Sequence, residues 1–237
     1  MARKQILQEL LSQADKIEHR FYDGLTKTER VQKGSSEHWA PKDIVAHIAY
    51  WKRYRLPDIQ RVLDGETVTV IEDFDAKNAG IFAEFAAKSW DEVLAYAAEA
   101  TAALSAQLSK MSEEDLEVTW PNERPLWWVV ISQAYTHPLI HIAEIYQQQD
   151  DVRLAAEITA MLGEPLAALD HSPGWMGTVH YNLACSYALL GQKDDAIAEL
   201  RQALALTPQL IEWAREDPDL DSLRDEAAYK ALDEAEE

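Results

Sequence analysis

The stretch Thr136-His137-Pro138-Leu139-Ile140-His141 lies within a long apolar segment that runs from about Leu126 to about Gln149. In a helix, the four-residue spacing of the two histidines puts both imidazoles on one face, one turn apart. Two neighbouring ligands of a divalent metal can have this arrangement. The segment therefore predicts a helix of the core, but the two histidines alone do not establish a metal site.

A third histidine, His47, lies in a similar apolar context far upstream, with alanine and isoleucine as its neighbours in the segment 39–51. Two helices of a bundle can bring three imidazoles to one point. Burying three uncompensated imidazoles in one core is costly unless something binds them. The pattern leaves two interpretations open: a shared metal site at His47, His137 and His141, or three histidines that form hydrogen bonds within the core.

The composition predicts a globular, acidic protein. The chain has 237 residues, of which 47% are hydrophobic, and it carries 42 acidic against 22 basic residues for a formal net charge of -20. This charge repels a phosphate backbone over most of the surface, so nucleic acid is not expected as a partner. The excess of acidic over basic residues is largest from Asp151 onward, where there are 18 acidic and 6 basic residues.

The single cysteine, Cys185, cannot form an internal disulfide, which fits a reducing compartment and excludes a cysteine-rich zinc module. The first residues, Met1 to Leu7, are charged and lead into an amphipathic pattern that does not resemble a signal peptide. No stretch approaches the length needed to cross a bilayer. We therefore expect a soluble protein of the cytoplasm that does not enter a membrane.

Apolar residues that recur at steps of three and four predict four long amphipathic helices. Two shorter helical segments are expected at 75–87 and 112–116, a loop at Thr26–His38 and an extended loop at Thr67–Ile71. Proline lacks the backbone N–H that a helix interior uses. We therefore expect Pro57 to bend or divide the second long helix and Pro138 to interrupt the fourth. The predicted long helices are Lys4–Leu25, Pro41–Leu63, Trp90–Leu108 and Leu126–Gln149.

The region from Val152 onward has a different pattern, that of the tetratricopeptide helix-turn-helix repeat. Small and aromatic residues fall at the typical positions of a 34-residue frame that starts at Gly177, although His180 occupies a position where tryptophan is usual. One repeat cannot bury its own faces. It must therefore dock on the bundle, on its flanking helices or on another chain, so a homodimer is one expectation. The frame residues are Leu183, Ala184, Tyr187, Gly191, Ala196, Ala203 and Pro208.

In the segments 39–47 and 137–141 the chain resembles the DinB-like superfamily of four-helix bundles, and in particular its ClbS/DfsB-type branch. The resemblance covers roughly Ala2 to Gln149. It implies an all-α fold, with a DinB-like four-helix bundle at residues 1–150 followed by a short tetratricopeptide-like helical region at residues 151–237. It also implies that His47, His137 and His141 bind a divalent metal, with zinc or nickel expected.

Members of this superfamily include transferases that use a low-molecular-weight thiol and resistance proteins that disarm electrophilic toxins. The resemblance therefore implies a metal-dependent transferase or hydrolase that acts on a small electrophilic substrate. The alternative is a non-catalytic protein that binds a metal or small molecule, or confers toxin resistance in a stress or detoxification role, and that contacts a protein partner through its repeat region.

Other residues near the histidines have two interpretations each. Glu144 and His38 are candidates for carrying protons or orienting a ligand, although each also fits an exposed structural role. An aromatic group either lines a pocket or packs in the core. Its members are Trp39, Tyr50, Trp51, Trp127 and Trp128.

Overall fold

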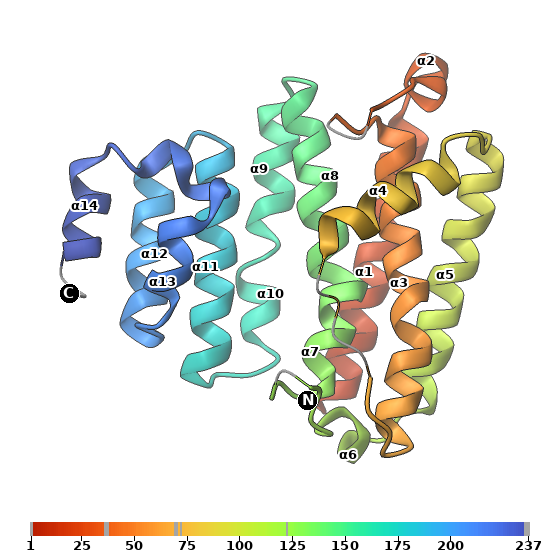
Figure 1. Ribbon diagram of the computed structural model, residues 1–237, viewed down its shortest axis with the longest axis horizontal. Helices are drawn as coiled ribbons and strands as arrows, with labels where there is room; N and C mark the ends of the chain where they lie inside the picture. Colours follow the sequence, from red (N-terminus) through yellow and green to blue (C-terminus); the bar gives the residue numbers. More distant parts are fainter. Residues whose placement is uncertain (1, 36–37, 69–70, 72, 122, 235–237) are drawn as a thin grey trace. The chain divides into compact units, whose positions relative to one another are not determined.

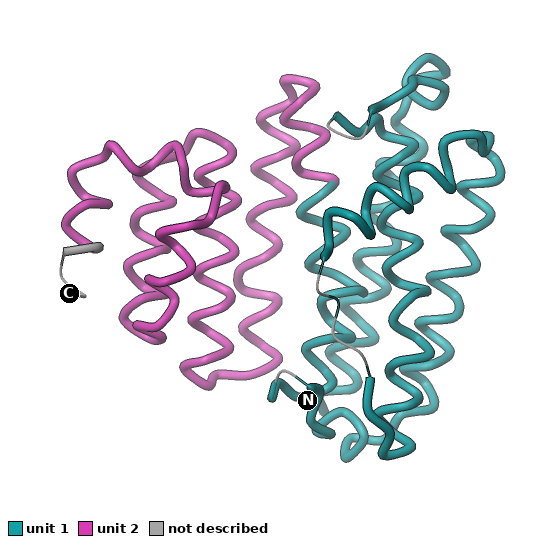
Figure 2. Tube along the Cα trace, viewed as in Figure 1, with its two compact units in different colours: residues 1–141 teal, residues 142–237 magenta. Residues whose placement is uncertain are grey.

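A computed structural model describes residues 2–35, 38–68, 71, 73–121 and 123–234 (Figure 1). The chain divides into two compact units, residues 1–141 and residues 142–237, each of which buries apolar side chains of its own (Figure 2). The predicted domain boundary between residues 150 and 151 stays a prediction. Among the described residues, no helix combines the length and the apolar character that a membrane span needs.

Unit 1 contains the long helices that the sequence predicts. They are α1 (Arg3–Gly24), α3 (Pro41–Leu63), α5 (Trp90–Lys110) and the run of α7 (Leu126–Ile131), η1 (Ser132–Thr136) and α8 (His137–Gln148), the last of which continues into unit 2. Three short helices connect them: α2 (Lys27–Val31), α4 (Phe74–Phe85) and α6 (Glu113–Leu116).

The sequence pattern predicts a core face for α5, and the structure confirms it with one exception. The predicted residues are Val93, Leu94, Ala97, Ala100, Leu104 and Leu108. The apolar residues of this face are buried at intervals of three and four, and the helix packs along α3. Leu94 is the exception, because it is only half-buried and lines a cavity. The helix begins where predicted, since Ser89 and Glu92 form a capping box in which each accepts the backbone N–H of the other. The buried residues of this face are Val93, Ala97, Ala100, Leu104 and Leu108.

The prediction of a loop from Thr26 to His38 is wrong in its first part, where α2 forms. Thr26 and Glu29 make a second capping box, with the Glu29 carboxylate accepting the Thr26 backbone N–H at 2.7 Å. This Thr-x-x-Glu signal is present in the sequence, but no apolar run follows it. The extended loop predicted at 67–71 includes residues 69 and 70, which lie outside the described part of the chain.

Pro57 does not divide α3, which is one helix from Pro41 to Leu63. Pro57 is exposed, so the Arg53 carbonyl that loses its partner lies on the hydrated side of the helix. Buried residues on both sides of the proline, Ile48 and Ile59, anchor the helix in the core. Burial of these apolar side chains offsets the lost hydrogen bond.

The fourth long helix is interrupted, as predicted, although just before Pro138. Residues Ser132–Thr136 form a π-helical segment in which the His137 backbone N–H donates to the Ser132 carbonyl, five residues back. Such segments are rare and often lie at functional sites. Here the segment ends directly at the first histidine of the pair.

Unit 2 is also helical and is built around a hairpin of α11 (Pro173–Leu189) and α12 (Lys193–Leu206). The helices α9 (Val152–Ala160) and α10 (Glu164–Ala167) precede the hairpin, and α13 (Leu210–Glu216), η2 (Pro218–Leu223) and α14 (Ala227–Glu234) follow it. Leu220, Leu223 and Tyr229 from these last elements join the buried core of the hairpin. The repeat therefore packs on its own flanking helices, one of the three alternatives that the sequence left open.

Two polar contacts account for unusual residues of unit 2. His180, at the position where tryptophan is usual, places its Nδ1 2.6 Å from the Glu199 carboxylate and so links α11 to α12. Cys185 is buried, and burial raises the pKa of its thiol well above the ordinary value. This thiol therefore stays protonated, as expected of a structural cysteine.

Gly177, the first residue of the repeat frame, permits a close approach of α11 to the end of α12. A Cβ atom added there would lie 2.2 Å from the Thr207 Oγ1 and 2.9 Å from the Thr207 Cβ. We expect Gly177→Ala to lower the free energy of unfolding by about 1–3 kcal/mol through overpacking. Gly174→Ala is the matched control, because nothing lies within 4 Å of its added Cβ. Chemical denaturation that gives equal stabilities for the two variants would contradict this assignment.

Candidate metal centre

The three predicted histidines meet in unit 1. His47 comes from the second turn of α3, and His137 and His141 come from the first two turns of α8. The Nε2 atoms of His47 and His137 are 3.0 Å apart, and one ring nitrogen from each of the three residues lies within 4.8 Å of the others. The ring centroids are 4.5–4.9 Å apart. Two helices that are distant in sequence thus bring three imidazoles together.

The spacing of the ring nitrogens fits a metal ion. Zinc is bound by histidine nitrogen at about 2.0–2.1 Å, so two nitrogens on one tetrahedral ion are separated by about 3.3 Å. The Nε2 atoms of His47 and His137 are 3.0 Å apart, which is close to this separation and is also a hydrogen-bond distance. Three histidines from two helices leave further coordination positions for a water or substrate, which is typical of catalytic rather than structural sites.

Burial favours the neutral form of two of these imidazoles, those of His47 and His137. It lowers the pKa of His47 to about 3, and the nearby His141 contributes in the same direction. The pKa of His137 is also well below its usual range, first because of burial and then because of His141, His47 and Lys52. A neutral imidazole carries the lone pair that a metal binds. The two most buried rings are therefore in the ligand form at neutral pH.

The Nδ1 edges of the His47 and His137 rings have no partner among the residues that the structure describes. The Nδ1 atoms of His47 and His137 are buried, and neither forms a hydrogen bond with any residue that the structure describes. In most metal sites the nitrogen that does not bind the metal donates to a carboxylate or carbonyl. Leaving a buried polar atom without a partner costs about 1–3 kcal/mol. The two Nε2 atoms lie at hydrogen-bond distance from each other, whereas the two Nδ1 atoms lack the acceptor that most metal sites provide.

Aromatic packing orients His47 instead. The rings of Trp39 and Trp51 meet its imidazole edge-on, with centroids at 4.7 Å and 6.3 Å. Helix α4 supports both tryptophans: the Phe82 ring lies 6.0 Å from that of Trp39, and Asn78 accepts a 3.2 Å hydrogen bond from the Trp51 indole. Two of the five aromatic residues singled out in the sequence therefore border the histidine group.

The other three aromatic residues make different contacts. Tyr50 stacks on Tyr54 with a centroid distance of 5.7 Å. Trp127 and Trp128 each lie beneath a guanidinium group, from Arg3 at 4.8 Å and from Arg124 at 4.7 Å, respectively.

The two candidate proton carriers have different surroundings. His38 is exposed, and its backbone N–H donates to the Ser35 Oγ. Glu144 is half-buried on α8, three residues after His141. Their proposed roles stay predictions.

The sequence interpretation missed a buried ion pair beside this group. Lys52 of α3 donates to Glu18 of α1 at 2.5 Å, and both side chains are 3% exposed. Lys52 also donates to the Thr101 hydroxyl, and Glu18 accepts from the Tyr22 hydroxyl at 2.7 Å. The signal was present, because both charged residues occupy positions on the apolar faces of their helices. Spacing alone did not show that they meet.

Two comparisons with protein families agree with this structure. The model of the DinB superfamily matches residues 10–145, and the chain therefore belongs to the DinB superfamily. The match is to the superfamily as a whole and does not distinguish the ClbS/DfsB-type branch. The model of the tetratricopeptide repeat matches residues 177–210, which confirms the frame that starts at Gly177. No curated protein and no solved structure matches the chain significantly.

The predicted all-α fold is thus confirmed: a DinB bundle is followed by a tetratricopeptide-like helical region. Superfamily membership and the three-histidine group together fit a metal-binding DinB-like protein.

The low pKa of His47 predicts acid sensitivity of the metal-free protein. The unfolded chain binds a proton at this position near pH 6.5 and the folded chain only near pH 3. Stability should therefore fall as the pH drops from 6.5 towards 3, by up to roughly 1.4 kcal/mol per pH unit. Thermal unfolding of chelator-treated protein between pH 7 and 5 should show a steeper decline for the parent chain than for His47→Gln. Parallel declines would refute this assignment.

Proposed function

We propose that His47, His137 and His141 bind one divalent metal ion, with zinc or nickel as the expected metal, and that the site is catalytic. The observation that carries the proposal is the convergence of three ring nitrogens within 4.8 Å from two separate helices. Membership of the DinB superfamily supports it. Burial lowers the pKa of His47 and His137, so both rings carry the lone pair that a metal binds at neutral pH.

The proposed reaction transfers a nucleophile to a small electrophilic substrate. A divalent metal at such a site lowers the pKa of a water or thiol and so supplies a nucleophile at neutral pH. With a low-molecular-weight thiol as the nucleophile the protein would be a transferase, and with water as the nucleophile it would be a hydrolase. Trp39 and Trp51 would restrict solvent on the His47 side. Glu144 and His38 are proposed to carry protons or orient a ligand.

The first test is metal analysis of protein purified without an affinity tag. We expect about one zinc or nickel ion per chain, removable by a chelator and restored by adding the metal. A screen of low-molecular-weight thiols with electrophilic substrates, run on the metal-loaded and chelated forms, then separates a transferase from a hydrolase. Failure to bind either metal at neutral pH would refute the proposed site.

A non-catalytic function is the alternative, and the repeat region favours it. A tetratricopeptide repeat suggests a protein partner. The contact between His180 and Glu199 and the buried core shared with the flanking helices give unit 2 a packed structure of its own. In this proposal the bundle holds a metal or small molecule and unit 2 binds a protein or a second copy in the cytoplasm. Stoichiometric metal binding without turnover in the thiol and hydrolysis screens would favour it. Light scattering distinguishes a homodimer from a monomer.

A further inference from the structure

The π-helical segment Ser132–Thr136 leaves one backbone carbonyl of the fourth long helix without a helical partner. In an α-helix the Gln133 carbonyl would accept the backbone N–H of His137, four residues further on. Here that N–H donates to the Ser132 carbonyl instead. The residue five positions after Gln133, where a π-helix would supply the donor, is Pro138, which has no N–H. The Gln133 carbonyl therefore receives no backbone hydrogen bond from the turn that follows it.

This carbonyl lies at the start of a buried stretch. Ala134, Tyr135 and Thr136 are each at most 9% exposed, and Pro138 is buried as well. Backbone carbonyls in such surroundings are almost always paired with a donor. A side-chain donor one turn further along the helix would satisfy Gln133.

His137 carries the complementary unpaired group. Its Nδ1 atom is buried and has no hydrogen-bond partner among the residues that the structure describes. Its Nε2 atom lies 3.0 Å from the Nε2 of His47 and therefore faces the histidine group. A metal binds the lone pair of Nε2, and a neutral imidazole then carries its proton on Nδ1. In the metal-bound state Nδ1 is therefore a buried donor that needs an acceptor.

The helix brings the two unpaired groups close together. Side chains on a helix lean towards its N-terminus, so the ring of one residue lies over the turn that contains the carbonyl four residues earlier. His19 in α1 shows that this contact is within reach, because its Nδ1 lies 2.8 Å from the carbonyl of Asp15. Gln133 has the same four-residue relation to His137. Its carbonyl is the better acceptor of the two, because it receives no backbone N–H.

We propose that the main-chain carbonyl of Gln133 is the acceptor that orients His137 when a metal is bound. Pro138 and the π-helical segment together keep this carbonyl free, and rotation of the imidazole about its side-chain bonds lets the Nδ1–H donate to it. Gln133 is thus a positioning residue, since its carbonyl acts on the metal through His137. This role rests on the proposed metal site, and it gives the rare π-helical winding a function there.

The first test observes the hydrogen bond directly. In zinc-loaded protein with isotope-labelled histidine rings, NMR should show the His137 Nδ1–H as a resonance that exchanges slowly with water, while Nε2 carries no proton. The ring of His171, which is exposed, is the reference for fast exchange. A His137 ring that is protonated on Nε2, or whose Nδ1 proton exchanges as fast as that of His171, would overturn the proposal.

The second test restores the missing N–H. Pro138→Ala gives the helix a donor for the Gln133 carbonyl, so zinc affinity should fall about 10- to 100-fold and the His137 Nδ1–H should lose its protection from exchange. Pro57→Ala is the matched control, because it restores an N–H on an exposed face inside α3 and should leave zinc affinity unchanged. Competition with a chromophoric chelator measures the affinity, and circular dichroism compares the helical content of the variants.

A third variant separates the main chain of Gln133 from its side chain. Gln133→Leu removes Oε1, which is also buried and has no partner among the described residues. Because the main chain is the proposed acceptor, this variant should keep the zinc affinity of the parent. Equal losses of affinity in Gln133→Leu and Pro138→Ala would assign the role to the side chain and overturn the proposal.

Two further results would count against the carbonyl of Gln133 alone. One is a Pro138→Ala variant that binds zinc as tightly as the parent. The other is a Pro138→Ala variant that binds zinc weakly while its Nδ1–H stays protected, because helix winding rather than the carbonyl would then explain the loss. A parent chain that binds neither zinc nor nickel would instead refute the metal site itself, and this role with it.

Discussion

Replacing His141 by alanine is expected to abolish stoichiometric metal binding and any thiol-transfer or hydrolytic activity, while the bundle stays folded. His141 supplies one of the three ring nitrogens of the proposed site, and the remaining pair, His47 and His137, holds a metal ion far more weakly. The rest of the core does not depend on this ring, because apolar faces of α1, α3 and α5 are buried. Metal analysis, circular dichroism and the thiol screen measure the three expectations.

The control for this variant is His171→Ala, which removes an exposed histidine of unit 2 and should change neither metal content nor activity. Metal stabilises the native state by mass action, so the parent chain should melt at a higher temperature with metal than without it. The His141→Ala variant should lose that difference. If the variant unfolds, or keeps full activity towards a substrate that the parent converts, the catalytic interpretation of the histidine group is wrong.

Replacing Lys52 by methionine is expected to destabilise unit 1 by about 3–5 kcal/mol, because it leaves the Glu18 carboxylate charged and without its partner in the core. The double variant Glu18→Leu with Lys52→Met should recover most of this loss, since an apolar pair of similar volume avoids the desolvation of two charges. Urea unfolding monitored by tryptophan fluorescence measures both changes.

An exposed ion pair provides the comparison. Arg53 and Glu99 lie 3.2 Å apart with side chains that are 51% and 70% exposed. Arg53→Ala should cost no more than about 1 kcal/mol, because solvent screens the pair. Equal losses for Lys52→Met and Arg53→Ala would show that the buried pair does not hold the bundle together.

The sequence predicted those parts of the fold in which a repeating pattern carries the information. The core face of α5 and the repeat frame from Gly177 both rest on periodicity, and both are confirmed. Periodicity within single helices also placed the histidine pair. The apolar context of His47 indicated a third candidate ligand, and the family resemblance implied the same three residues. The structure brings all three rings together.

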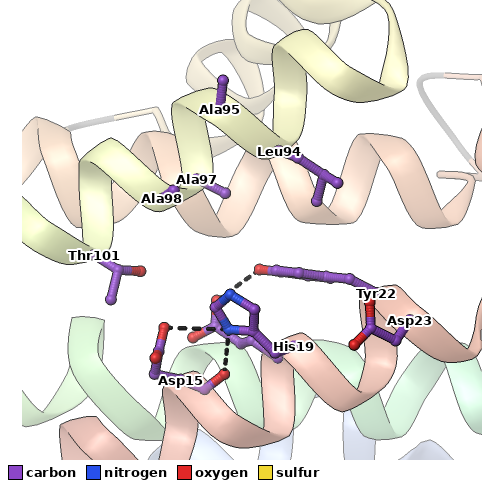
Figure 3. Close-up of a pocket in the computed structure, with 10 residues that line it drawn as sticks. Asp15, His19, Tyr22, Asp23, Leu94, Ala95, Ala97, Ala98 and Thr101 are labelled. Carbon is purple, nitrogen blue, oxygen red and sulfur yellow. Dashed lines mark hydrogen bonds and ion pairs between the residues drawn. The ribbon is translucent and has the colours of Figure 1, made fainter.

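Other features depend on contacts between distant residues and left no periodic trace. The ion pair of Glu18 and Lys52 joins positions 34 residues apart, and although each charge lies on the apolar face of its helix, neither helix shows by itself that the two residues meet. The cavity between α1 and α5 is lined by polar residues of one helix and by alanines such as Ala98 of the other, so neither helix alone indicates it (Figure 3). The short helix α2 was missed for a different reason. Its capping box can be recognised in the sequence, but the helix has no apolar face that would identify it as a helix.

The π-helical segment before His137 affects the direction in which the histidine pair of the proposed metal centre points. An α-helix turns about 100° per residue, and a single-turn π segment accommodates one extra residue within the helix. If the same five residues, Ser132–Thr136, were wound as a regular α-helix, they would turn the helix further and rotate His137 and His141 as a rigid pair about the helix axis. The pair would keep its own four-residue geometry and yet face a different direction from His47. The winding of this segment therefore sets whether the histidine pair and His47 point to the same place.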